Sequence, residues 1–107
     1  MSKEIEKPLK RLADLNTKEC LWIYILRILK DGPVHAYVLR EEINNRYGFM
    51  PGTVTAYRVL YSLNADGFVE RKSDGRKEIY TITPRGQEIL KKAIHFYENL
   101  SKLLRHK

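Results

Sequence analysis

The sequence predicts one mainly α-helical domain with a small β-hairpin and a long final helix. Its 107 residues are 43% hydrophobic, which is enough apolar material for a single core. Through most of the chain the apolar residues recur every three or four positions, as they do on one face of a helix. Between residues 68 and 82 the spacing changes to alternation around an Asp-Gly pair, which is typical of a hairpin.

Two helices are expected in the first thirty residues. Leucines spaced by three between residues 9 and 15 suggest a short amphipathic helix beginning at Pro8. Asn16 followed by Glu19 resembles a capping box, so a second helix would start there and continue through the apolar run. The Asp-Gly-Pro at residues 31–33 would end it.

Two further helices are expected between residues 35 and 66. One spans His35 to Tyr47 and ends at Gly48, because glycine tolerates the left-handed conformation that closes many helices. The next would be capped by Thr53 and run to about Asp66. Its buried stripe would consist of Ala56, Val59, Leu60 and Leu63.

A hairpin and a long helix complete the chain. β-branched and aromatic residues on both sides of Asp74 and Gly75 predict two strands joined by a turn. Thr83 followed by Pro84 is a typical helix start, because a hydroxyl can cap the helix and proline fits its first turn.

This order of elements predicts a winged helix-turn-helix. Three short helices and a hairpin share one core when the third helix crosses the second and the hairpin covers their open side. The outer face of the third helix then stays free to enter the DNA major groove. We therefore divide the chain into an N-terminal arm (1–16), a winged helix-turn-helix domain (17–83) and a C-terminal dimerisation helix (84–107).

Candidate DNA contacts on the third helix follow from projecting it at about 100° per residue. With the apolar stripe inward, polar residues without acids face outward, and such residues suit base edges and phosphates. The candidates are Thr53 at the N-terminal end and Thr55, Arg58, Tyr61 and Ser62. The alternative is that the long side chains among them only cover apolar surface.

The hairpin provides a second group of candidates. Residues 71–85 contain five Lys or Arg and only two acids, and a glycine keeps the tip slim. Lys72, Arg76 and Lys77 would reach the DNA backbone or the minor groove. His35, at a helix start, would cap that helix or meet a phosphate.

The composition favours a polyanionic partner. Twenty Lys and Arg against thirteen Asp and Glu give a formal net charge of +7. Nucleic acid is the first candidate and an anionic membrane surface the second. No apolar run approaches the roughly 20 residues of a spanning helix, and the N-terminus lacks the apolar core of a signal peptide, so we expect a cytoplasmic protein.

No catalytic or metal site is predicted. His35, His95 and His106 fall in three separate elements, and the single Cys20 excludes paired-thiolate zinc patterns. The sequence contains neither a Gly-rich phosphate loop nor a His-Glu-x-x-His helix. We expect a protein that is not an enzyme and needs no cofactor.

Residues 21–90 resemble the PadR-type transcriptional regulators, which are winged-helix repressors. ILRILKDGPVHAYVLREEINNRYG is similar to the family's apolar helix, Gly-Pro break and second helix, with Ala36 where glycine is usual. TAYRVLYSLNADGFVERK resembles the third helix, which makes Thr55 and Tyr57 the family's pair there, although Arg58 replaces the usual proline. GRKEIYTITPRGQEIL is similar to the wing and the entry to the last helix.

The last helix carries an apolar seam with heptad-like spacing. Its members are Leu90, Ile94, Tyr97, Leu100 and Leu104. A helix of over twenty residues is about 30 Å long, more than the small domain can cover, so we expect a homodimer through this helix. Its two recognition helices would lie about 34 Å apart and read a roughly palindromic duplex site.

The sequence thus predicts a homodimeric, sequence-specific regulator that binds double-stranded DNA, with repression by steric blocking as the default. Two alternatives stay open. The winged helix could dock on a protein instead of DNA. A small aromatic effector could also bind between subunits beside Trp22, Phe96 and Tyr97, although packing explains those aromatic residues more simply.

Overall fold

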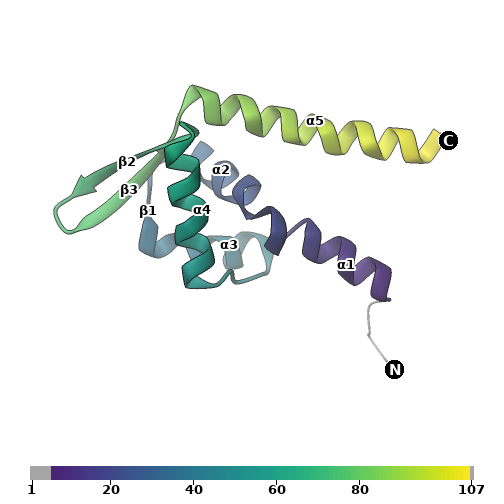
Figure 1. Cartoon of the computed structure of the whole chain (residues 1–107), viewed down its shortest axis with the longest axis horizontal. Helices are drawn as coiled ribbons and strands as arrows, with labels where there is room; N and C mark the ends of the chain where they lie inside the picture. The colour runs from purple at the N-terminus through teal and green to yellow at the C-terminus, as the bar shows by residue number, and fades with distance from the viewer. Residues whose placement is uncertain (1–5, 107) are drawn as a thin grey trace.

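Helices dominate the structure, a computed structural model that describes residues 6–106 (Figure 1). In chain order the elements are α1 (Lys7–Leu15), a 3-10 turn η1 (Lys18–Cys20), α2 (Leu21–Lys30), β1 (Val34–His35), α3 (Ala36–Tyr47), α4 (Thr53–Ala65), β2 (Val69–Asp74), β3 (Lys77–Ile82) and α5 (Pro84–His106). The predicted winged-helix fold with a long last helix is confirmed. Within the described residues, none of the helices combines the length and apolar character needed to cross a membrane.

The core lies where α2 meets α3, α4 and the sheet. Ile25 and Leu26 of α2 are fully buried, and Ile43 of α3 and Leu60 of α4 pack into the same cluster. Burial of one such aliphatic side chain contributes about 1.5–3 kcal/mol to stability. This packing holds α4 against the body by one face and leaves its other face outward.

The sheet has three strands, in the order β1-β3-β2, all antiparallel. The predicted hairpin is present, with Asp74 paired to Lys77 across a turn whose Gly75 has φ +66°. The strand β1 is not predicted from the sequence, because two residues are too short to show alternation. In β1, His35 pairs with Ile79 and directly precedes α3. The expectation that the helix begins at His35 is therefore wrong by one residue.

The predicted capping box at Asn16 and Glu19 is wrong. Asn16 closes α1 instead, where its side-chain amide donates to the Leu12 carbonyl at 2.8 Å. The residues that follow form η1, and α2 begins only at Leu21. The short polar side chain is used for the end of one helix rather than for the start of the next.

The start of α4 also differs from the prediction. Gly52 is the N-cap residue, and Thr53 is the first helical residue and does not cap the helix with its side chain. The connector is held from α3, because Arg40 Nε donates to the carbonyl of the buried Pro51 at 2.7 Å. This bond ties α3 to the connector just before α4.

The cap predicted at Thr83 is confirmed. Its hydroxyl accepts the Gly86 amide at 3.0 Å and donates to the Gly67 carbonyl at 2.7 Å. One side chain therefore joins the start of α5 to the end of α4.

The two terminal helices extend from the body on the same side (Figure 1). No residue of α1 is buried, and beyond Leu90 the apolar residues of α5 lie mostly at the surface. Leu90 itself is 2% exposed and belongs to the core of the single chain. It is therefore not available to a seam between subunits, and that part of the seam prediction is corrected.

Candidate nucleic-acid interface

The outward face of α4 consists of the predicted side chains. Ala56, Leu60 and Leu63 are buried and Val59 is half-buried, which fixes the orientation of the helix. The opposite side leaves Val54, Thr55, Arg58, Tyr61 and Ser62 exposed. Thr53 is exposed at the N-terminal end. A helix with this face free has the size to enter a groove about 12 Å wide.

The tyrosines of α4 lie toward the hairpin. Tyr57 is half-buried, and its ring centroid is 6.1 Å from that of Tyr61. The Tyr61 ring in turn lies 5.8 Å from the guanidinium carbon of Arg71 on β2. Tyr57, which the family resemblance assigned to DNA, thus lies on the flank of the exposed face.

The register of the hairpin decides on which face each basic side chain lies. Residues paired across an antiparallel sheet share a face, and successive residues on a strand alternate between faces. Arg71 pairs with the buried Tyr80, so it shares the face turned toward the core and α4. Lys72 pairs with Ile79 and lies on the opposite face.

That opposite face also carries Lys77 and His35. Lys77 Nζ lies 5.3 Å from the ring centroid of Tyr37, whose ring is 5.6 Å from that of His35. Tyr37 is 58% exposed at the start of α3. The structure therefore separates the predicted contacts: Arg58 and Tyr61 share the surface of α4, whereas Lys72, Lys77 and His35 gather on the far face of the sheet.

Arg76 occupies the turn between the strands and is exposed. It is the predicted wing residue that extends farthest along the hairpin. Sequence reasoning missed Arg71 and Tyr37 as candidates, because their positions depend on the register and on β1. The excess of cations between residues 71 and 77 was the available signal for Arg71.

Two hollows flank α4. One of about 430 Å³ lies toward α2 and α5 and is lined by Trp22, Arg58, Val59, Ser62, Leu63, Asp66, Phe68 and Ile89. A smaller one of about 190 Å³ lies at the N-terminal end of α4 and is lined by Lys18, Glu19, Met50, Pro51, Gly52 and Thr55, so it carries one cation and one acid. Phe96 and Tyr97 contact each other on α5, with 5.8 Å between their ring centroids. Neither of them lines the hollow that contains Trp22, so the single chain does not bring the three aromatic residues together.

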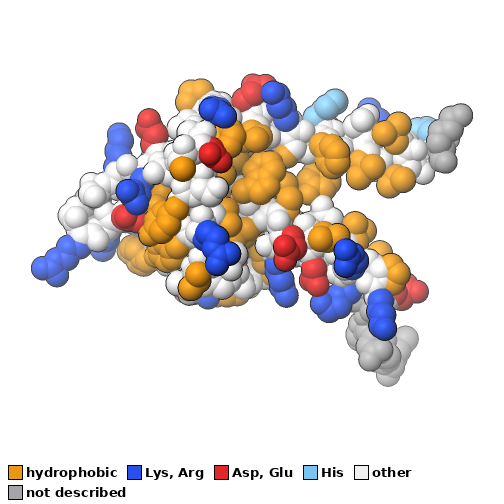
Figure 2. All heavy atoms as spheres, in the orientation of Figure 1, with side chains coloured by type: hydrophobic (Ala, Val, Ile, Leu, Met, Phe, Trp, Pro, Cys, Tyr) orange, Lys and Arg blue, Asp and Glu red, His pale blue; other side chains and the backbone are white. Residues whose placement is uncertain are grey.

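An apolar groove of about 630 Å³ lies between α1 and α5, lined by Leu9, Leu12, Ala13, Asn16, Tyr97, Leu100, Ser101 and Leu104. Figure 2 shows hydrophobic side chains along the facing sides of α1 and α5. The Tyr97 hydroxyl donates to Asn16 Oδ1 at 2.7 Å and so ties α5 to the end of α1. Burial and a hydrogen bond with the Cys20 thiol raise the pKa of Tyr97 to about 12, so this hydroxyl stays protonated.

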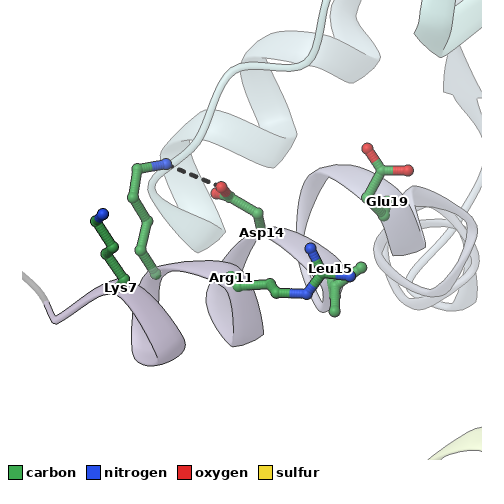
Figure 3. A pocket seen from close by; sticks show the side chains of 6 residues that line it. Lys7, Arg11, Asp14, Leu15 and Glu19 are labelled. Atoms are coloured by element: carbon green, nitrogen blue, oxygen red, sulfur yellow. Dashed lines mark hydrogen bonds and ion pairs between the residues drawn. The ribbon is translucent and has the colours of Figure 1, made fainter.

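The polar side of α1 is drawn in Figure 3, beside a hollow of about 460 Å³. Lys7, Lys10 and Arg11 line it together with two acids, Asp14 and Glu19. Lys10 Nζ pairs with Asp14 at 2.9 Å. The charge of this hollow is mixed, so it does not extend the basic surface of the hairpin. Across residues 6–106, no three His, Cys, Asp or Glu side chains gather as a metal ion would require.

Comparison with solved structures gives the same fold. A PadR family transcriptional regulator from Eggerthella lenta superimposes with a TM-score of 0.75 at 18% identity, over 94% of this chain and 95% of that chain. A PadR family regulator from Clostridium difficile gives 0.70 at 20% identity, over 78% and 93%. F93 from STIV, a winged-helix DNA-binding protein, gives 0.69 at 17% identity, over 78% and 92%.

Comparison of sequences adds a relative and a family. An uncharacterized 37.1 kDa protein in transposon TN4556 of Streptomyces fradiae is 32% identical over 78 residues. The match covers 72% of this chain and 23% of that protein, so the chain spans about a quarter of its relative's length. Residues 25–92 match the model of the transcriptional regulator PadR-like family, which covers the core, α4, the hairpin and the start of α5. The chain therefore belongs to the PadR-like family of transcriptional regulators, which is not a family of enzymes.

Proposed function

We propose that the protein binds specific sites on double-stranded DNA in the cytoplasm, as a homodimer, and represses transcription by occupying them. The segment 53–66 would lie in the major groove and the hairpin 71–78 on the backbone or in the adjacent minor groove. The observation that carries the proposal is the exposed face of α4, which presents hydroxyl, phenol and guanidinium groups and has no acid from Thr53 to Ala65. A helix face that contacted only solvent would be expected to include acidic residues as well.

Individual roles follow from the chemistry of each side chain. Arg58 projects from the middle of the exposed face, where a guanidinium can donate to both acceptors of a guanine. Thr55 and Ser62 can donate to phosphates, and the N-terminus of α4 itself favours an anion through its free backbone amides. Arg76 at the tip can reach the next stretch of backbone.

The proposed dimer rests on the groove between α1 and α5. Leu12 and Leu104 are 57% and 74% exposed on its two sides. Apolar surface gains about 25 cal/mol for each Å² removed from water, so a second copy whose α5 fills this groove would be stabilised. Two-fold symmetry would then present two copies of α4 to a roughly palindromic site.

Selection of bound sequences from random duplexes, followed by titration of variants, tests this function. Arg58→Ala should lose about 1–3 kcal/mol of binding and relax the preference at one base pair. Arg76→Ala should weaken binding to all sequences equally. It should also reduce the steepness of the plot of log affinity against log salt concentration (the salt slope) by about 0.9. Lys92→Ala removes the same charge from the exposed side of α5 and is the control. Parent-like binding by both test variants would reject α4 as the docking face.

A small aromatic effector is a second proposal, supported by the hollow that Trp22 and Phe68 line beside Arg58. A ligand there would contact the flank of α4 and could change its fit to DNA. Titration of tryptophan fluorescence with small aromatic carboxylates tests it directly, because the chain has one tryptophan. An unchanged spectrum would reject this proposal and leave DNA binding unaffected.

A further inference from the structure

We propose that Arg71 is a further DNA-binding residue, placed beside Tyr61 and Glu78 at the junction of α4 and the hairpin so that its guanidinium meets a phosphate. This inference rests on the proposed function, because it assumes that α4 and the hairpin dock on one duplex. It adds a DNA contact at the place where the exposed face of α4 meets the hairpin.

The first argument is the position of the side chain. Arg71 pairs with Tyr80, a ring that is 1% exposed, so its backbone is fixed over the core. On this face of the hairpin its guanidinium reaches the Tyr61 ring, with 5.8 Å from the guanidinium carbon to the ring centroid. A cation over the face of a tyrosine is attracted by the ring's quadrupole. Arg71 therefore spans from the wing to the exposed side of the recognition helix.

The second argument is that the guanidinium keeps free donors. Its ion pair with Glu78 is 3.4 Å long, and the two side chains are 44% and 36% exposed. An ion pair of this length between two partly solvated side chains is worth little in binding energy. Arginine has five N–H donors in a planar fork, so one contact with a carboxylate leaves donors for a phosphate.

The third argument is the contrast with the neighbouring cations. Lys72 lies on the other face of the sheet, and Lys77 is placed over Tyr37 there. Among the strand cations from 71 to 77, Arg71 is the one that shares a face with α4. A duplex seated on α4 would thus meet this side chain before it met Lys72.

Arg71→Ala tests the contact, with unfolding temperatures measured to show that the variant is folded. We expect weaker binding to every duplex and a salt slope lower by about 0.9, because one phosphate is no longer neutralised. A purely structural role would change the unfolding temperature without changing the slope. Binding and slope equal to those of the parent would overturn the inference.

A double variant separates a phosphate contact from simple neutralisation of Glu78. Arg71→Ala combined with Glu78→Gln has the parent's net charge. If Arg71 contacts a phosphate, the double variant keeps the loss in affinity and slope. If Arg71 only masks Glu78, the double variant binds like the parent, and the inference is wrong.

The same titrations separate this inference from the proposed function. A parent protein that binds no duplex would reject the proposed function, and the inference with it. Loss of binding in Arg58→Ala and Arg76→Ala, with none in Arg71→Ala, would reject the inference alone. Lys92→Ala again serves as the charge-matched control outside the interface.

Discussion

Gly86 lies where α5 crosses the base of the hairpin, and the space there excludes a side chain. A Cβ at this position would lie 2.1 Å from the Phe68 carbonyl oxygen. That carbonyl also accepts the Thr83 amide at 3.2 Å, so it cannot move away without losing a hydrogen bond. The first turn of α5 therefore packs directly against the backbone at Phe68 and the side chain of Ile82.

We predict that Gly86→Ala lowers the free energy of unfolding by about 1–3 kcal/mol, the usual cost of overpacking. This loss should exceed the gain of up to about 1 kcal/mol in helix propensity. Thermal unfolding followed by circular dichroism measures it. Gln87→Ala, at the next and exposed position of α5, is the control. Equal unfolding temperatures for the two variants would contradict the packing described.

Asp31 joins the end of α2 to α3 by accepting from two arginines. Arg46 Nη1 lies 2.7 Å from one carboxylate oxygen and Arg27 Nη1 lies 3.0 Å from the other. These hydrogen bonds, that of Arg46 foremost, hold the pKa of Asp31 below its ordinary value of 3.8. A carboxyl with a depressed pKa stabilises the fold above its unfolded value, and that contribution disappears as the pH falls through the folded pKa.

Asp31→Asn should therefore lower the unfolding temperature at pH 7 by a small amount, since the group is exposed. The difference from the parent should shrink as the pH falls below about 3.8 and vanish once Asp31 of the parent is protonated in both the folded and the unfolded state. Unfolding curves recorded from pH 2 to 7 measure this, with Glu88→Gln on the surface of α5 as the control. A difference that does not change with pH would show that the ion pairs contribute nothing.

At the scale of elements, the proposed dimer depends on the two terminal helices, α1 and α5. Both expose leucines on the sides that face each other, and one hydrogen bond from Tyr97 to Asn16 joins them in the single chain. With 9 residues, α1 is too short to cover the apolar side of α5, which has 23 residues. In the proposed dimer, a second copy of α5 would supply the missing apolar surface.

Leu100→Asp should convert the dimer to a monomer, because it places a carboxylate in the apolar groove. His95→Asp introduces the same group on the other side of α5 and should leave the dimer intact. Sedimentation equilibrium measures the mass of each protein. A parent that is monomeric, or a Leu100→Asp variant that remains dimeric, would contradict assembly through this groove.

Periodicity predicted that the helices exist, and short-range signals predicted their starts with mixed success. The spacing of three and four residues predicted α3, α4 and α5, because many apolar side chains must share one face, and Thr83 with Pro84 predicted the start of α5 correctly. Asn16 was assigned to the wrong helix, since the same amide can serve either the end of α1 or the start of the next helix. β1 has two residues and leaves no pattern to read.

At the scale of the whole molecule, part of the candidate site could be predicted and part could not. Projection of one helix was enough to expect Arg58 and Tyr61 on the surface, because exposure there depends on local geometry alone. The separation of Arg71 from Lys72 and Lys77 depends on the strand register and on contacts with α3 and α4. Long-range packing of this kind leaves no signal in residue spacing.

The net charge of +7 and the proposed two-fold symmetry would both increase the salt dependence of DNA binding. A dimer doubles the number of phosphates neutralised, and each adds about 0.9 to the slope of affinity against salt concentration. The groove between α1 and α5 lies away from the hairpin, so the proposed assembly would leave the basic surface free (Figure 1). The division of the chain at residues 16 and 83 stays a prediction.

Mapping of backbone amide shifts by NMR, during titration with a selected duplex, tests the central claim most directly. Docking through α4 predicts that the largest changes fall on residues 53–62 and on the hairpin from Arg71 to Lys77, and that they disappear at high salt. The exposed polar side of α1 and the end of α5 should change little. Changes confined to those two arms, with α4 unaffected, would contradict the account.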